Sequence, residues 1–126
     1  MNAPRVEGDM KRVLVVDDSG FQRTLVRDAL TDGYEVVGEA SDGTEAVETF
    51  DRLSPDVVTM DVMMPNTNGI EATARIKRAS PETTVVMVTS VEQREQMKEA
   101  IRAGADGYVT KPFDGEEVRS AIDEAS

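Results

Sequence analysis

The sequence predicts an α/β fold in which a parallel β-sheet is covered by helices on both faces. Short apolar runs, rich in Val, alternate along the chain with segments whose apolar residues recur at helical spacing. The runs are continuously apolar rather than alternating, which is typical of strands buried on both faces of a parallel sheet. A chain of 126 residues fits one such domain, and we expect five strands and five helices in strict alternation.

The expected strands each end next to a residue that could carry chemistry, with one exception. We expect strands at 13–16, 34–37, 57–60, 85–88 and 108–110. The residues that follow the first, third, fourth and fifth of them are Asp17 with Asp18, Asp61, Thr89 and Lys111. Ligands of such sheets bind beyond the carboxyl ends of the strands. Three carboxylates, a hydroxyl and an ammonium group are therefore expected to meet at one edge, where a divalent cation and a phosphoryl group could bind.

Polar residues mark where the helices begin. A Ser or Asp stands before four helical segments, with Glu or Gln three residues later, at Ser19, Asp42, Ser90 and Asp114. Phe21, Leu25 and Ala29 recur every four residues in the first helix, and Met97, Ala100 and Ile101 are expected to face inward from the fourth. Because Ser19 already caps the first helix, the pair Asp17 and Asp18 is left without an evident structural role.

The composition limits the chemistry. The chain has no Cys and no His, so thiolate chemistry, disulfides, imidazole bases and His metal ligands are excluded. Any metal must be held by oxygen, which favours Mg²⁺, Mn²⁺ or Ca²⁺. The net charge of -11 argues against nucleic acid as a direct partner. No apolar stretch reaches the length of a membrane span, so we expect a cytoplasmic protein that does not bind membranes.

The acidic surface has two open explanations. Only four Lys stand against ten Arg and 25 acidic residues, a balance that suits high intracellular salt, where repulsion between charges is screened. An ordinary acidic cytoplasmic protein is the other explanation. Residues 1–10 are polar and show no periodicity, so we expect a short disordered leader.

Five motifs in order carry a resemblance to a known family. They are VLVVDDS at 13–19, MDVMMPNTNG at 60–69, VTS at 88–90, AGADGY at 103–108 and KPF at 111–113. With them the chain resembles the receiver domain of two-component response regulators, of the stand-alone, CheY-like chemotaxis type. The resemblance covers nearly the whole chain. It implies a receiver domain at 11–126 with a flavodoxin-like, doubly wound (βα)5 fold and strand order 2-1-3-4-5.

The resemblance also assigns roles at the sheet edge. It implies that Asp61 accepts a phosphoryl group from a sensor histidine kinase. Asp17, Asp18, Asp61 and the backbone carbonyl of Met63 would hold Mg²⁺, with Asp17 acting mainly through water. Lys111 would pair with the phosphoryl oxygens. The chain itself would not be a turnover enzyme, because it would catalyse only its own phosphorylation and slow dephosphorylation.

A conformational switch is the second implication of the resemblance. Thr89 would turn toward the new phosphate, Tyr108 would move from an exposed to a buried rotamer, and the bond before Pro112 would be cis. The output face would comprise the fourth helix, the strand of Tyr108 and the fifth helix, and would bind a motor or adaptor protein. Its exposed candidates, which could equally be a solvated surface, are Arg94, Glu95, Lys98, Glu99, Arg102 and Arg119. We expect a monomer.

Other functions remain open at this point. A phosphatase of the dehalogenase type also uses an Asp nucleophile on a parallel sheet, but it needs a second Asp two positions on, where this chain has Ser19. A docking module that is never phosphorylated would not need the complete five-residue set. A dinucleotide-binding site would need a Gly-rich turn after the first strand. Within the receiver family, a phosphorelay intermediate or a pathway unrelated to motility is the alternative to chemotaxis.

Overall fold

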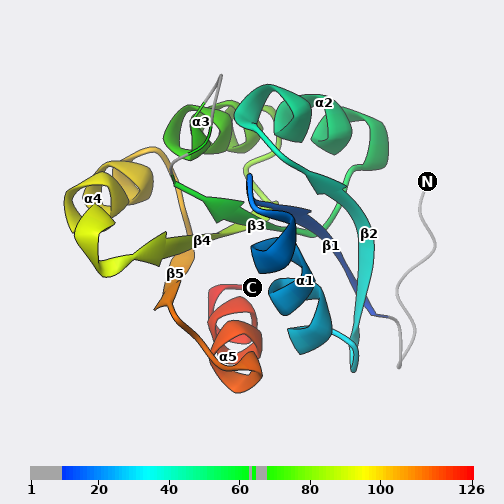
Figure 1. The fold of residues 1–126 in the computed structure, drawn as a ribbon. Coiled ribbons are helices and arrows are strands. Elements are labelled where there is room, and N and C mark those ends of the chain that lie inside the picture. Colours follow the sequence, from blue (N-terminus) through cyan, green and yellow to red (C-terminus); the bar gives the residue numbers. More distant parts are fainter. Residues whose placement is uncertain (1–9, 63, 65–67) are drawn as a thin grey trace.

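The computed structural model, which describes residues 10–62, 64 and 68–126, contains one parallel five-stranded sheet between two layers of helices (Figure 1). The strands are β1 (Lys11–Val16), β2 (Tyr34–Ala40), β3 (Val57–Asp61), β4 (Thr84–Ser90) and β5 (Gly107–Lys111). All neighbouring strands pair in parallel, in the order β2-β1-β3-β4-β5. The fold class and strand order expected from the sequence are confirmed.

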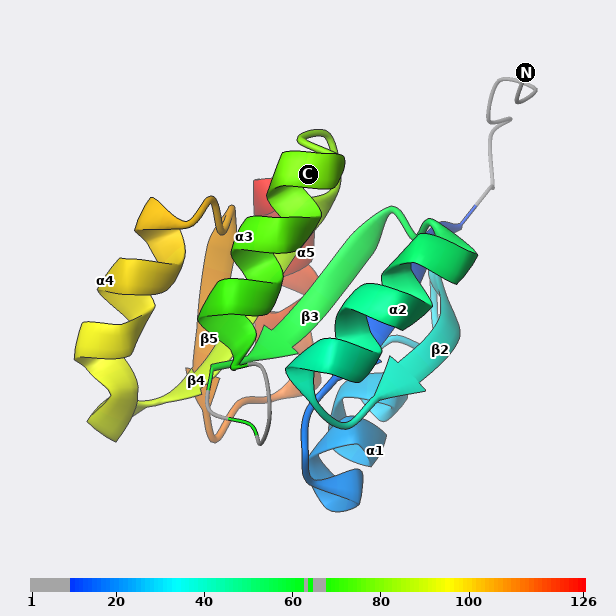
Figure 2. The same ribbon diagram turned by 90° about the horizontal axis from the view of Figure 1, so that it is seen from above.

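The helices divide between the two faces of the sheet. They are α1 (Gly20–Ala29), α2 (Gly43–Leu53), α3 (Gly69–Ala79), α4 (Arg94–Arg102) and α5 (Gly115–Ala125), with a 3-10 turn η1 (Val91–Gln93) directly before α4. Helices α1 and α5 cover one face, and α2, α3 and α4 cover the other (Figures 1 and 2). None of the helices among the described residues is long and apolar enough to cross a bilayer.

Two apolar cores explain why the strands are continuously apolar. Val13 and Val15 of β1 pack into the layer of α1 and α5, whereas Leu14 and Val16 pack into the layer of α2, α3 and α4. All four side chains are almost fully buried. Burying a side chain of this size stabilises the fold by about 1.5–3 kcal/mol, so neither face of β1 can become polar at low cost.

The helix caps agree with the sequence at three places. Ser19 Oγ accepts the Gln22 N–H at 3.2 Å, and Asp42 Oδ1 accepts the Glu45 N–H at 2.7 Å. Asp114 and Glu117 form a reciprocal capping box. Ser90 differs, because it forms a capping box with Gln93 at the start of the turn η1, and α4 itself starts only at Arg94.

Three details of the sequence interpretation need correction. Ile101, expected to face inward, is half exposed, because Ala100 occupies the buried stripe of α4 and the next residue lies about 100° around the helix. Of the residues that marked α1, Phe21 is 71% exposed and only Ala29 is buried. Strand β2 continues to Ala40, three residues beyond the predicted end. Apart from Met10, the leader expected at residues 1–10 lies outside the described residues.

Candidate functional site

The carboxyl edge of the sheet brings four of the predicted side chains together. Asp17 directly follows β1, Asp61 ends β3 and Lys111 ends β5. Carboxylate oxygens of Asp17, Asp18 and Asp61 lie within 4.8 Å of one another. Lys111 Nζ is 3.0 Å from Asp17 Oδ2 and 3.7 Å from Asp61 Oδ1. Three acidic groups and one ammonium group from three strands therefore share one small volume.

Burial makes this cluster electrostatically strained. Asp17 and Asp61 are 2% and 4% exposed, whereas Asp18 is exposed. Burial, and next the negative charge of Asp17, raise the pKa of Asp61 from 3.8 to about 7, against the opposing charge of Lys111. A single ammonium group does not balance three carboxylates. The cluster therefore fits a hard divalent cation, which prefers carboxylate oxygens.

Asp17 has a structural role that the sequence did not show. Its Oδ1 accepts the Ser19 N–H at 3.0 Å, while its Oδ2 receives the ammonium group of Lys111. The expectation that the pair Asp17 and Asp18 has no structural role is therefore wrong for Asp17, which also orders the turn into α1. Both of its oxygens are engaged, so a direct cation contact from Asp17 would compete with these bonds.

A glycine lets the start of α3 lie close to the end of β3. The Gly69 N–H donates to the Val62 carbonyl at 2.9 Å. A Cβ atom at Gly69 would lie only 1.9 Å from the backbone oxygen of Asp61, so no other residue fits without moving the backbone. Asn68 caps α3 through its side chain, whose Oδ1 accepts the Glu71 N–H at 2.9 Å. Met63, the predicted backbone ligand, lies outside the described residues.

Thr89 is buried at the same edge, but its hydroxyl bonds toward η1. Thr89 Oγ1 donates to Gln93 Oε1 at 3.1 Å, and the same oxygen accepts the Ser90 N–H at 3.1 Å. Tyr108 is 49% exposed. The Lys111–Pro112 peptide bond is cis. The sequence identified Gln93 only as part of a cap, because nothing local showed that its side chain would reach Thr89.

The predicted output surface is smaller than expected. Five of its six candidates are exposed on α4, namely Arg94, Glu95, Lys98, Glu99 and Arg102. Arg119 is the exception, because its Nη1 donates to the Ala29 carbonyl of α1 at 2.9 Å. It joins two helices of the same layer instead of pointing away from α5.

Comparison with known proteins decides the family. A model of the response regulator receiver domain matches residues 13–123. The chain belongs to the response regulator receiver domain family. The chemotaxis protein CheY of Halobacterium salinarum is 49% identical over 89% of this chain and 93% of its own length. The CheY of Thermotoga maritima is 44% identical over 92% of this chain and 98% of its own length.

Solved structures agree with this receiver domain in fold. The response regulator domain of Thermotoga maritima CheB is 41% identical, covers 91% of this chain and 98% of its own, and gives a TM-score of 0.79. A chain from the CheX–CheY–BeF3–Mg²⁺ complex of Borrelia burgdorferi is 29% identical. It covers 89% of this chain and 86% of its own length, with a TM-score of 0.83. The protein is a response regulator of the CheY type, a regulatory class and not a classical enzyme. Receiver domains of this class act through a phosphorylation-dependent switch.

Proposed function

We propose that residues 11–126 form a chemotaxis receiver that takes a phosphoryl group from a phosphohistidine onto Asp61. The observation that carries this proposal is the convergence of Asp17, Asp18 and Asp61 within 4.8 Å, with Lys111 beside them. This convergence of three carboxylates favours phosphoryl transfer over a docking module, because a docking surface does not require carboxylates placed so close together. The dehalogenase-type alternative needs a second Asp at position 19. This chain has Ser19 there, and the Ser19 side chain caps α1.

In the proposed reaction, an oxygen of the ionised Asp61 carboxylate attacks phosphorus in line with the leaving imidazole. The new O–P bond forms as the N–P bond breaks, and the imidazole keeps the electron pair. Asp17, Asp18 and Asp61 would hold Mg²⁺, with the Met63 carbonyl as the further ligand that the family resemblance implies. When bound, Mg²⁺ supplies charge neutralisation for the carboxylates and the phosphoryl oxygens. The Borrelia burgdorferi relative, solved with BeF3 and Mg²⁺, supports this metal.

Lys111 would hold the transferred group. Its ammonium now lies between Asp17 and Asp61, 3.0 Å and 3.7 Å away. A phosphoryl group on Asp61 brings additional negative oxygens within its reach. Thr89 would then exchange its bond to Gln93 for one to the phosphate, and the half-exposed Tyr108 would move inward. Phosphorylation would thereby favour one of two pre-existing conformations.

The partners in this proposal are a sensor histidine kinase and a protein bound by the α4–β5–α5 face. The exposed charged residues of α4 would form the greater part of that face, and a motor or adaptor protein would be its target. A monomer in the cytoplasm suits both contacts. The transcriptional regulatory protein PdtaR of Mycobacterium tuberculosis, 40% identical over 98% of this chain and 62% of its own length, supports a pathway outside motility as the second candidate.

The test is phosphorylation followed by intact mass. The protein is incubated with a phosphorylated histidine kinase or acetyl phosphate, with Mg²⁺ or with EDTA. We expect one phosphoryl group per chain, present only with Mg²⁺ and absent from Asp61→Asn. Asp51→Asn, which changes an exposed carboxylate on α2, is the matched control and should be labelled normally. Equal labelling of wild type and Asp61→Asn contradicts the proposal.

A further inference from the structure

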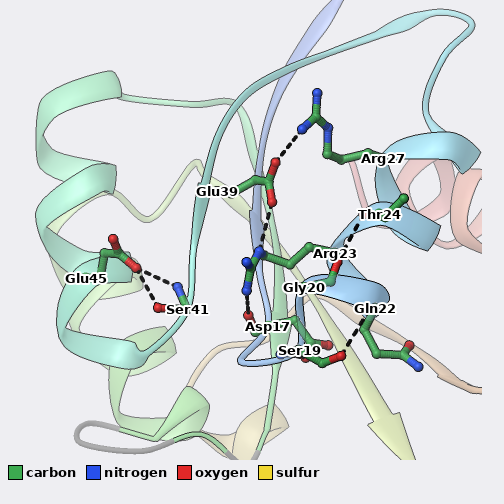
Figure 3. A network of polar contacts seen from close by, with 10 residues as sticks. All are labelled: Asp17, Ser19, Gly20, Gln22, Arg23, Thr24, Arg27, Glu39, Ser41 and Glu45. Carbon is green, nitrogen blue, oxygen red and sulfur yellow. Dashed lines mark hydrogen bonds and ion pairs between the residues drawn. The ribbon is translucent and has the colours of Figure 1, made fainter.

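Arg23 of α1 connects the loop after β1, which carries Asp17 and Asp18, to strand β2 (Figure 3). This loop is called the acidic loop below. Arg23 Nε donates to Glu39 Oε1 of β2 at 2.8 Å, and Arg23 Nη1 donates to the backbone oxygen of Asp17 at 2.7 Å. The rigid guanidinium group spans the two acceptors at once, which the ammonium group of a lysine could not reproduce. The Arg23 side chain is 22% exposed, so water competes only partly for these bonds.

The bond to the Asp17 oxygen acts on the peptide that joins the two acidic residues. That oxygen belongs to the planar unit between Asp17 and Asp18, so its direction also fixes the first backbone atoms of Asp18. The Asp17 N–H on the other side donates to the Ala40 carbonyl of β2 at 3.1 Å. The backbone of Asp17 is thus held at both ends from outside the loop.

Glu39 offsets part of the positive charge of this arrangement. A lone guanidinium group next to a cation site would repel the cation, but Glu39 is bonded to both Arg23 and Arg27. Burial tends to raise the pKa of Glu39, and the hydrogen bonds from Arg23 and Arg27 outweigh it, so the pKa lies below its usual value. Arg23 therefore donates to Asp17 from a group of two guanidinium groups and one carboxylate, in which Glu39 offsets one of the two positive charges.

We propose that Arg23 is a positioning residue of this receiver, held by Glu39, which fixes the Asp17–Asp18 peptide and so directs both carboxylates toward the cation site. The inference rests on the proposed Mg²⁺ site. It adds that affinity for the cation depends on a side chain that does not ligate it. Partners behind metal ligands commonly affect metal affinity by about 10- to 100-fold.

Arg27 offers a matched control, because it bonds the same Glu39 from the same helix without touching the loop. The test measures Mg²⁺ affinity by calorimetry, together with urea unfolding, for wild type, Arg23→Gln, Arg23→Lys and Arg27→Gln. We expect both Arg23 variants to bind Mg²⁺ about 10-fold more weakly, and Arg27→Gln to change affinity less than about 2-fold. Arg23→Lys keeps the charge, so weak binding by this variant assigns the effect to the lost contact.

The outcomes separate this inference from the proposed function. If the wild type binds no Mg²⁺, the metal site itself is wrong. If the wild type binds Mg²⁺ but the Arg23 variants bind it equally well, or Arg27→Gln loses as much affinity as they do, only the positioning role is overturned. Should Arg23→Gln fail to fold, Arg23→Lys decides the question. The amide resonance of Asp18 provides a second readout, which should move in the Arg23 variants and not in Arg27→Gln.

Discussion

Replacing Asp61 by Asn should stabilise the protein when no divalent cation is present. The native state holds the Asp61 carboxyl almost buried, with its pKa raised from 3.8 to about 7 by burial and next by the charge of Asp17. Above about pH 7 the native state must carry an ionised group that the unfolded chain accommodates more easily. Asn has a similar shape without this charge, so the penalty disappears.

The size and pH window follow from the same pKa. Because the folded pKa is raised, the native state binds more protons than the unfolded chain between pH 3.8 and about 7. The stability contributed by protonated Asp61 is complete below that window and is lost as the pH rises through it, by at most about 1.4 kcal/mol per pH unit. The advantage of Asp61→Asn should therefore grow from near zero at about pH 4 to about 2–4 kcal/mol at about pH 8.

Urea unfolding in EDTA, followed by circular dichroism from about pH 4 to about pH 8, measures this difference. Asp51→Asn, at an exposed position on α2, should show no such pH-dependent gain. Added Mg²⁺ should reduce the advantage of Asp61→Asn, because the cation stabilises the wild-type native state by binding to it. A difference that does not change with pH, or an Asn variant less stable than wild type at about pH 8, would refute the electrostatic reasoning.

Three further changes have defined outcomes. Gln93→Ala removes the acceptor that holds the Thr89 hydroxyl at 3.1 Å, so affinity for beryllofluoride with Mg²⁺ should rise by about 5-fold. Gly69→Ala places a Cβ 1.9 Å from a backbone oxygen, so urea unfolding should show a loss of about 3 kcal/mol or more. Tyr34→Phe loses the 2.6 Å bond to Asp123, which should cost about 1 kcal/mol at neutral pH. It should also abolish the tyrosine absorbance change near pH 12, the pKa to which burial, and next Asp123, raise Tyr34.

Each of these expectations has an outcome that contradicts it. Weaker or unchanged beryllofluoride binding by Gln93→Ala would show that Gln93 does not restrain Thr89. Near-wild-type stability of Gly69→Ala would mean that the start of α3 can move away from the Asp61 backbone at little cost. An absorbance change near pH 12 that persists in Tyr34→Phe would show that Tyr34 is not the group that titrates there.

The sequence predicted those parts of this molecule that depend on local pattern. Continuous apolar strands follow from burial on both faces, and Asp42 and Asp114 cap their helices through residues only three positions away. The convergence of Asp17, Asp18, Asp61 and Lys111 followed from parallel topology, because the carboxyl ends of the strands share one edge.

The remaining features depend on how far particular side chains reach. Arg23 and Glu39 are 16 positions apart and meet only because β2 pairs with β1. Arg119 turned toward α1 instead of solvent, where it found the carbonyl of Ala29. Periodicity and composition predict neither contact, because an arginine at position 23 or 119 could bond to several different acceptors.

Locating the transferred phosphoryl group shows whether Asp61 is the acceptor. The protein is phosphorylated in the presence of Mg²⁺, the acyl phosphate is trapped by borohydride reduction, and the tryptic peptides are sequenced by mass spectrometry. Cleavage after Arg52 and Arg75 releases residues 53–75, in which Asp61 is accompanied by only one other Asp, at position 56. We predict that the reduced residue is Asp61 and that EDTA abolishes it. Modification at Asp17, Asp18 or Asp56, or at Asp61 without any divalent cation, would overturn the assignment of Asp61 as a cation-dependent phosphoryl acceptor.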